Sequence, residues 1–141
     1  MKFWDSSGIV PLLVTQSTTA RLLDLYREDS ALAAWWGSRT ECDSAVARLE
    51  REGALTTAET TRALKRLTSL SGRWREVQPL PELRDIARRY LRTHPLRAGD
   101  ALQLAAAFVV AERQPESLEF VCLDDRLSVA AEREGFPVIR V

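Results

Sequence analysis

The sequence predicts a single α/β domain in which helices flank a mainly parallel central sheet. Short apolar runs that are typical of strands alternate with longer amphipathic segments along the whole chain, as in parallel sheets with helical crossovers. No repeat or low-complexity tract interrupts this alternation. The chain has 141 residues, of which 45% are hydrophobic and 28% charged, values that suit one folded domain. We therefore expect residues 1–141 to form one domain.

Five short segments, most of them apolar, are predicted as strands, because each is bounded by turn-forming or charged residues. They cover residues 3–4, 31–35, 74–77, 118–123 and 137–141. The run at 118–123 has the clearest strand pattern, and both this run and the first one end at carboxylates.

Seven segments are predicted as helices from their apolar spacing and their end signals. They begin near residue 9, after Ser17 or Thr18, after the Ser38–Glu41 capping-box spacing, at Thr56 or Thr57, at Pro81, near residue 97 and near residue 127. The helix from about 97 to 113 is apolar nearly all round, so we expect it to be buried.

Several classes of protein are excluded by composition. The longest apolar stretch, near residues 101–111, is about half the roughly 20 residues that a membrane span requires. Asp5 interrupts any secretory signal core. Cys42 and Cys122 lie 80 residues apart without a CxxC motif, so neither a zinc site nor a disulfide is expected, and both thiols should be buried. These features favour a cytoplasmic protein with no membrane partner.

The charge of the chain is balanced in total but unevenly distributed. The formal net charge is zero, and arginine outnumbers lysine 18 to 2. Residues 61–97 hold ten basic and three acidic side chains, so this segment carries +7 and the remainder −7. Two interpretations are open for the basic segment: solvated helix faces, or a surface that faces RNA.

Acidic residues follow the predicted strands at the edge where parallel sheets bind ligands. Asp5 follows the first strand, and Asp124 and Asp125 follow the fourth. Glu41 opens the helix after the second strand, and Asp100 lies in the first turn of the apolar helix. Each acid also has a purely structural interpretation, as a strand end, a cap or a partner of the helix dipole. Their joint occurrence favours one shared pocket.

A cluster of carboxylates in one pocket predicts a divalent cation. Crowded carboxylates raise one another's pKa, and a hard cation relieves that repulsion. Ligands that are all oxygen point to Mg²⁺ or Mn²⁺, which can lower the pKa of bound water and assist displacement at phosphorus. The only histidine, His94, precedes Pro95 in a predicted loop, so we do not expect it to act as a base.

Four stretches of the chain, taken in order, resemble the PIN-domain ribonucleases, specifically the VapC-type toxins of bacterial toxin–antitoxin pairs. The stretches are a strand ending in Asp5-Ser6-Ser7, a helix entered at Glu41 and followed by Ser44-Ala45, the run LRAGDALQLAAA at 96–107, and FVCLDDRL at 120–127 leading to AAEREG at 130–135. The similarity extends over nearly the whole chain, and LRxxDALxLA is its most specific piece.

The resemblance implies a PIN-like fold and a metal-dependent endoribonuclease. By position, Asp5, Glu41, Asp100 and Asp124 match the four acids that bind the metal and activate water in that family. It also implies hydrolysis of RNA phosphodiester bonds, a cognate antitoxin that blocks the site, and commonly a homodimer. A catalytically silent PIN-like module that binds RNA or protein is the alternative.

The sequence departs from the family pattern at two positions and leaves the ligand set open at two others. Gln103 stands where the family often has histidine, and Cys122 where it has threonine or serine. Asp125 and Asp43 are further candidate ligands. We expect Asp124 to be the fourth acid in preference to Asp125, because adjacent side chains of a strand that reaches this point face opposite ways.

Overall fold

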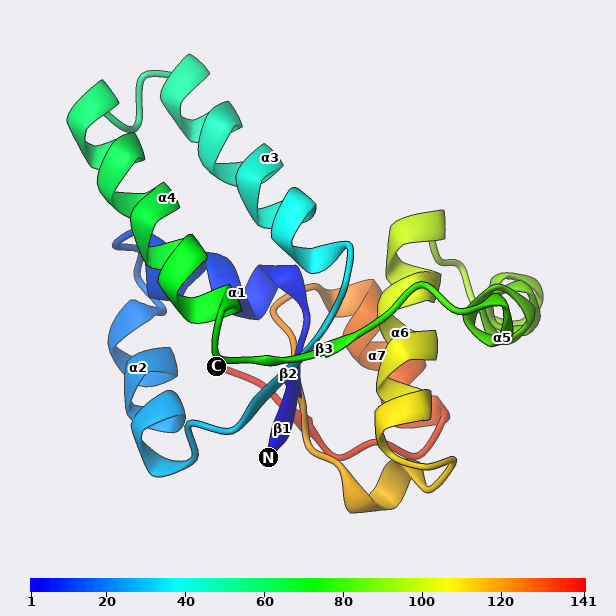
Figure 1. Ribbon diagram of the computed structural model, residues 1–141. Helices are drawn as coiled ribbons and strands as arrows, with labels where there is room; N and C mark the ends of the chain where they lie inside the picture. The colour runs from blue at the N-terminus through cyan, green and yellow to red at the C-terminus, as the bar shows by residue number, and fades with distance from the viewer.

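Five short strands form one parallel sheet at the centre of the computed structural model, which describes residues 1–141 (Figure 1). The strands are β1 Lys2–Trp4, β2 Leu32–Trp35, β3 Arg75–Val77, β4 Phe120–Val121 and β5 Val138–Ile139. Their order is β3-β2-β1-β4-β5, and every neighbouring pair is parallel. The chain proceeds outward from β1 to β3 and then returns to place β4 on the other side of β1. The switch in strand order therefore lies between β1 and β4.

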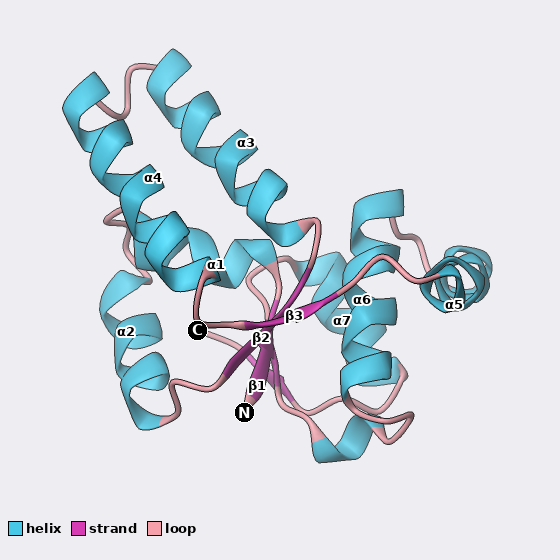
Figure 2. Cartoon of the chain, in the orientation of Figure 1, coloured by secondary structure: helices cyan, strands magenta, loops and turns pink.

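Seven helices cover the two faces of this sheet (Figure 2). They are α1 Ser6–Leu13, α2 Thr19–Glu28, α3 Ser38–Arg51, α4 Thr57–Ser71, α5 Pro81–Thr93, α6 Ala98–Val110 and α7 Asp125–Arg133, with a short 3-10 turn at Pro115–Ser117. Helices α1 to α4 lie on one face and α5 to α7 on the other. The hairpin of α3 and α4 extends beyond the sheet. The predicted α/β architecture is confirmed, and the sheet is parallel throughout.

The alternating side chains of the strands divide the interior into two apolar cores. Phe3 and Ala33 belong to a core of 21 buried residues shared with α5, α6 and α7. Trp4, Leu32 and Ala34 belong to a core of 15 buried residues shared with α1 to α4. The central strands β2 and β4 are apolar and buried on both sides, as parallel sheets require. The edge strand β3 instead carries the exposed Arg75 and the half-buried Glu76.

Local interactions move several helix ends away from their predicted positions. Helix α1 begins at Ser6 and not near residue 9, because the Asp5 carboxylate caps it by accepting from the backbone N–H groups of Ser7 and Gly8. The capping box predicted from Ser38 to Glu41 is absent, since Ser38 is already inside α3. A capping box is formed instead at the start of α4 by Thr56 and Glu59.

Strand ends also differ from the sequence prediction. The run at 118–123 pairs only over Phe120–Val121, and the last run pairs only over Val138–Ile139. The predicted helix from 97 to 113 ends at Val110, and Glu112 and Arg113 follow with positive φ angles of 52° and 64°, which end helical geometry. The apolar pattern therefore located these elements but overestimated their lengths.

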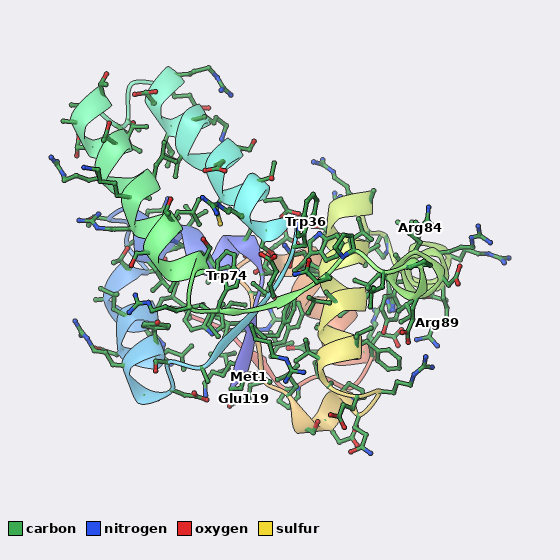
Figure 3. All side chains as sticks on the ribbon, viewed as in Figure 1. Met1, Trp36, Trp74, Arg84, Arg89 and Glu119 are labelled. Atoms are coloured by element: carbon green, nitrogen blue, oxygen red, sulfur yellow. The ribbon has the colours of Figure 1, made fainter.

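The basic segment is divided between two surfaces. Residues 61–97 run from α4 through β3 to α5, and α4 and α5 cover opposite faces of the sheet. Arg84 and Arg89 lie on α5, on the side of the molecule opposite to α4 (Figure 3), and the Arg89 guanidinium lies over the rings of Tyr90 and Phe108. The basic side chains of this segment are thus distributed over α4, the region of β3, α5 and the start of α6, and those of α4 and α5 lie over opposite faces of the sheet.

Other sequence predictions concern the cysteines, the histidine and the membrane. Both cysteines are free and buried, as expected. His94 is buried at the end of α5, where its Nε2 lies 2.7 Å from a Glu134 carboxylate oxygen. Among the helices of the structure, none has the length and apolar character needed to span a membrane.

Candidate functional site

All four predicted acids lie at helix starts along the carboxyl edge of the sheet. Asp5 directly follows β1 and caps α1, and Asp124 follows β4 and caps α7. Glu41 is in the first turn of α3, which follows β2. Asp100 is in the first turn of α6, whose Gly99 is close to Glu41: a Cβ there would be 3.5 Å from Glu41 Oε1. Because β2, β1 and β4 are neighbours, the topology brings these four positions to one side of the molecule.

Asp5 is the most buried of these acids, with 4% of its surface exposed. Its Oδ1 accepts from Ser7 Oγ at 2.7 Å, and its Oδ2 accepts from the Ser7 backbone N–H at 3.2 Å. Burial raises the pKa of the Asp5 carboxyl from 3.8 to about 6, although these hydrogen bonds act in the opposite direction. An anion at this position is therefore poorly solvated and would be favoured by a nearby cation.

The Ser7 hydroxyl connects Asp5 to the loop that carries Asp124. Besides donating to Asp5, Ser7 Oγ accepts from the Leu123 backbone N–H at 2.8 Å. Cys122 is buried beside it, and its Sγ donates to the Asp124 carbonyl at 3.4 Å. Burial raises the pKa of the Cys122 thiol to about 12. The thiol at this position therefore acts as a neutral donor to the loop backbone.

Glu41 is held by two neutral donors. Its Oε2 accepts from Ser6 Oγ at 2.6 Å and from Gln103 Nε2 at 3.1 Å. Gln103 is 1% exposed and also contacts the buried Ser38 hydroxyl. Sequence reasoning missed this network, because it read Ser38 as a helix cap and treated Gln103 only as a departure from a family pattern. The available signal was a glutamine within an apolar helix, since a buried amide requires partners.

Asp100 and Asp124 both perform the structural roles that the sequence left open as alternatives. Asp100 is half-buried, and its Oδ2 accepts from the Arg97 backbone N–H at 3.3 Å. Burial is the first cause of its raised pKa, and repulsion from Asp124 is a smaller one. Asp124 Oδ1 accepts from the Leu127 backbone N–H at 2.8 Å. Together with Asp5, three of the four acids thus also cap helices.

The strand predicted to reach Asp124 and Asp125 ends before them, so strand alternation does not separate these two side chains. Strand β4 ends at Val121, so neither aspartate lies on a strand. The two differ instead by helix position: Asp124 is the N-cap of α7, whereas Asp125 is its first residue. The Asp125 side chain is 98% exposed and lies 3.9 Å from an Arg140 nitrogen.

Mutual repulsion is not the main cause of the raised pKa values of Asp5 and Asp100. Desolvation is the largest cause for both Asp5 and Asp100, and no other carboxylate is among the causes for Asp5. The side chains are not gathered into a ready coordination sphere: no group of three or more His, Cys, Asp or Glu is arranged to hold a metal ion. Their chemistry nonetheless fits a hard cation. Glu41 Oε1, Asp100 Oδ1 and Asp124 Oδ2 accept no hydrogen bond within the chain, and carboxylate oxygens are the ligands that Mg²⁺ and Mn²⁺ prefer.

Comparison with known proteins reveals similarity in structure and not in sequence. No family model matches the chain, and no curated protein matches it. The crystal structure of PAE2754 from Pyrobaculum aerophilum superposes with a TM-score of 0.66 at 19% identity, over 99% of this chain and 88% of that one. FitAcB from Neisseria gonorrhoeae gives a TM-score of 0.65 at 18% identity, over 99% and 96% of the two chains. FitAB bound to an IR36 DNA fragment gives 0.67 at 18% identity, over 99% and 94%.

The chain has the PIN fold. The PIN-like architecture implied by the resemblance is therefore confirmed over essentially the full length. In this PIN fold the carboxyl edge of β2, β1 and β4 carries all four matched acids.

Proposed function

We propose that the protein is a metal-dependent endoribonuclease, the toxin of a type II toxin–antitoxin system. The observation that carries the proposal is the position of Asp5, Glu41, Asp100 and Asp124. These residues are spread over 120 positions of the sequence, yet the PIN fold brings them all to helix starts at one edge of the sheet. They are the four positions that match the acids of VapC-type toxins.

The four acids would hold Mg²⁺ or Mn²⁺ through their carboxylate oxygens. When bound, such an ion lowers the pKa of a coordinated water and stabilises the charge that develops at phosphorus. The chain itself orients the ligands: Ser7 holds Asp5, while Ser6 and Gln103 hold Glu41.

The helix starts at this edge differ in what they offer a phosphodiester substrate. The first turns of α1 and α7 are capped by the Asp5 and Asp124 carboxylates, whereas α3 has no capping side chain. Uncapped N–H groups and the positive end of the helix dipole stabilise anions, so the start of α3 is the one suited to a phosphate. The proposed substrate is RNA, as the resemblance to VapC-type toxins implies, and it is cleaved by hydrolysis.

The proposed partners follow from the same assignment. They are a cognate antitoxin that blocks the acidic edge, and a second copy of the chain in a homodimer, in the cytoplasm. Light scattering of the purified protein, alone and co-expressed with the product of a neighbouring small gene, tests both partners.

A silent PIN-like binding module is the second candidate. It is favoured by the use of Asp5, Asp100 and Asp124 as helix caps, a role that needs no metal. The two candidates differ in one measurable property, which is metal-dependent cleavage of RNA.

Cleavage assays with matched variants test the proposal. The wild type should cleave RNA in Mg²⁺ or Mn²⁺ and arrest growth on induced expression, and Asp100→Asn and Glu41→Gln should abolish both effects while the circular dichroism spectrum is retained. Asp124→Asn should also abolish cleavage, whereas Asp125→Asn, at the exposed neighbouring position, should not. Cleavage by Asp100→Asn at the wild-type rate would refute the assignment and leave the binding module as the better interpretation.

A further inference from the structure

Gln103 occupies an unusual position for a polar side chain. It lies in α6 between buried apolar residues such as Leu104 and Ala105, and it is 1% exposed. Both ends of its amide have partners: Nε2 is 2.9 Å from Ser38 Oγ and 3.1 Å from Glu41 Oε2, and Oε1 accepts from Ser38 Oγ at 3.2 Å. An amide buried in this way is stable only when it is bonded, so its position is closely determined.

The orientation of the amide follows from the charge of its neighbour. A carboxylate oxygen only accepts hydrogen bonds, so the NH₂ group of Gln103 must face Glu41. The Ser38 hydroxyl, which can donate and accept, lies within reach of both amide atoms, 2.9 Å from Nε2 and 3.2 Å from Oε1. Ser38 is 0% exposed and belongs to the first turn of α3, one helical turn before Glu41. The amide therefore joins α6 to the start of α3 through both of these residues.

The consequence for Glu41 is an asymmetric carboxylate. Oε2 accepts two hydrogen bonds, one from Ser6 of α1 and one from Gln103 of α6. Oε1 accepts none and lies beside Gly99, next to Asp100 in the sequence. Oε2 is thus occupied by two neutral donors, whereas Oε1 accepts no hydrogen bond and lies near the first turn of α6.

We propose that Gln103, supported by Ser38, is a positioning residue that fixes Glu41 so that only Oε1 is available as a ligand for the divalent cation. Gln103 is 1% exposed and its amide NH₂ is already bonded to Ser38 and Glu41, so it is not assigned as a ligand itself. A glutamate side chain has several rotatable bonds, and the two donors on Oε2 remove that freedom before the ion binds. The inference rests on the proposed function and deepens it, because it assigns how one ligand of that site is oriented.

The test replaces the donor while preserving the volume of the side chain. Gln103→Met keeps the length and packing of the residue but cannot donate to Glu41. Calorimetric titration with Mn²⁺ should show a dissociation constant raised about tenfold or more over the wild type, the range for partners that orient metal ligands. RNA cleavage by the variant should recover toward the wild-type rate as Mn²⁺ is raised, which a general structural defect would not allow.

A second variant, at a half-buried position, tests the same positioning effect in case Gln103→Met impairs folding. Ser6→Ala removes the other donor to Oε2 from the half-buried start of α1, and it should also weaken Mn²⁺ binding. If the wild type binds Mn²⁺ and both variants bind it equally well, the positioning role is refuted while the proposed function stands. If the wild type binds no Mn²⁺ and cleaves no RNA, the proposed function itself fails, and the role of Gln103 in metal binding fails with it.

Discussion

Replacement of Asp5 by asparagine should stabilise the protein at neutral pH in the absence of metal. The carboxyl has a pKa of about 6 in the folded chain against an ordinary value of 3.8, because burial disfavours its ionised form. At about 1.36 kcal/mol per pH unit, ionisation of the buried group opposes folding by about 3 kcal/mol above pH 6. Asparagine stays neutral, so it avoids this destabilisation.

The gain is reduced by the hydrogen bonds that asparagine cannot make. Asp5 accepts through both oxygens, whereas asparagine has one acceptor, and each lost bond costs about 0.5–1.5 kcal/mol. The expected net stabilisation at pH 7.5 is about 2 kcal/mol. For a domain of this size, that corresponds to a rise in Tm of about 6 °C.

The pH dependence identifies the cause of the effect. Between about pH 4 and pH 6 the folded wild type binds more protons at Asp5 than the unfolded chain, so its stability falls as the pH rises through this window. The advantage of Asp5→Asn should therefore be constant above about pH 6.5, shrink below pH 6 and vanish or reverse near pH 4.

Thermal unfolding followed by circular dichroism in EDTA, from pH 4 to pH 8, measures this difference. Asp125→Asn is the matched control, since it removes a negative charge from a side chain that is 98% exposed, and it should show no such pH-dependent gain. A variant less stable than the wild type across the whole range, or a difference that does not change with pH, would refute the reasoning about burial.

Two further predictions concern packing and thiol chemistry. A Cβ at Gly37 would overlap the buried Trp35 indole, so Gly37→Ala should lower the free energy of unfolding in urea by about 1–3 kcal/mol. Gly72→Ala is the control, since the closest atom to its Cβ is 3.4 Å away, and it should be neutral or slightly stabilising. Equal effects of the two substitutions would contradict the overlap. Burial raises the pKa of the Cys42 thiol far above its usual value and that of the Cys122 thiol to about 12. Neither thiol should therefore react with Ellman's reagent in the native protein, whereas both should react in urea. Rapid labelling of either thiol in the native protein would contradict its burial.

Much of the fold was predictable because it depends on local or periodic signals. Central strands that are buried on both faces are apolar, so short apolar runs marked β1, β2 and β4. Pro81 marked the start of α5, as its ring suits the first helical position. Strand lengths were less predictable, because pairing stops where the neighbouring strand turns away. The sequence of one strand contains no information about where its neighbour turns.

The candidate site was predictable in its residues but not in its contacts. The carboxyl ends of parallel strands share one edge, so acids that follow the strands had to lie along it. The donors that hold Glu41 were not predictable, because Ser6 and Gln103 lie 35 and 62 residues from it in the sequence. They meet it only because the sheet brings the starts of α1, α3 and α6 to one edge. The low exposure of Asp5, which raises its pKa, likewise arises from elements brought together by folding.

The sequence by itself determined the class of fold, the succession of its elements and the acids at their ends, since these follow from periodicity, capping and chain direction. Only the tertiary structure decided the order β3-β2-β1-β4-β5, the distribution of the basic segment over two faces, and the separation of Asp124 from Asp125 by helix position instead of strand alternation. The physical reason is that burial, hydrogen-bond pairing and the placement of charge depend on contacts between residues distant in the chain. Such contacts produce no periodic pattern in the sequence.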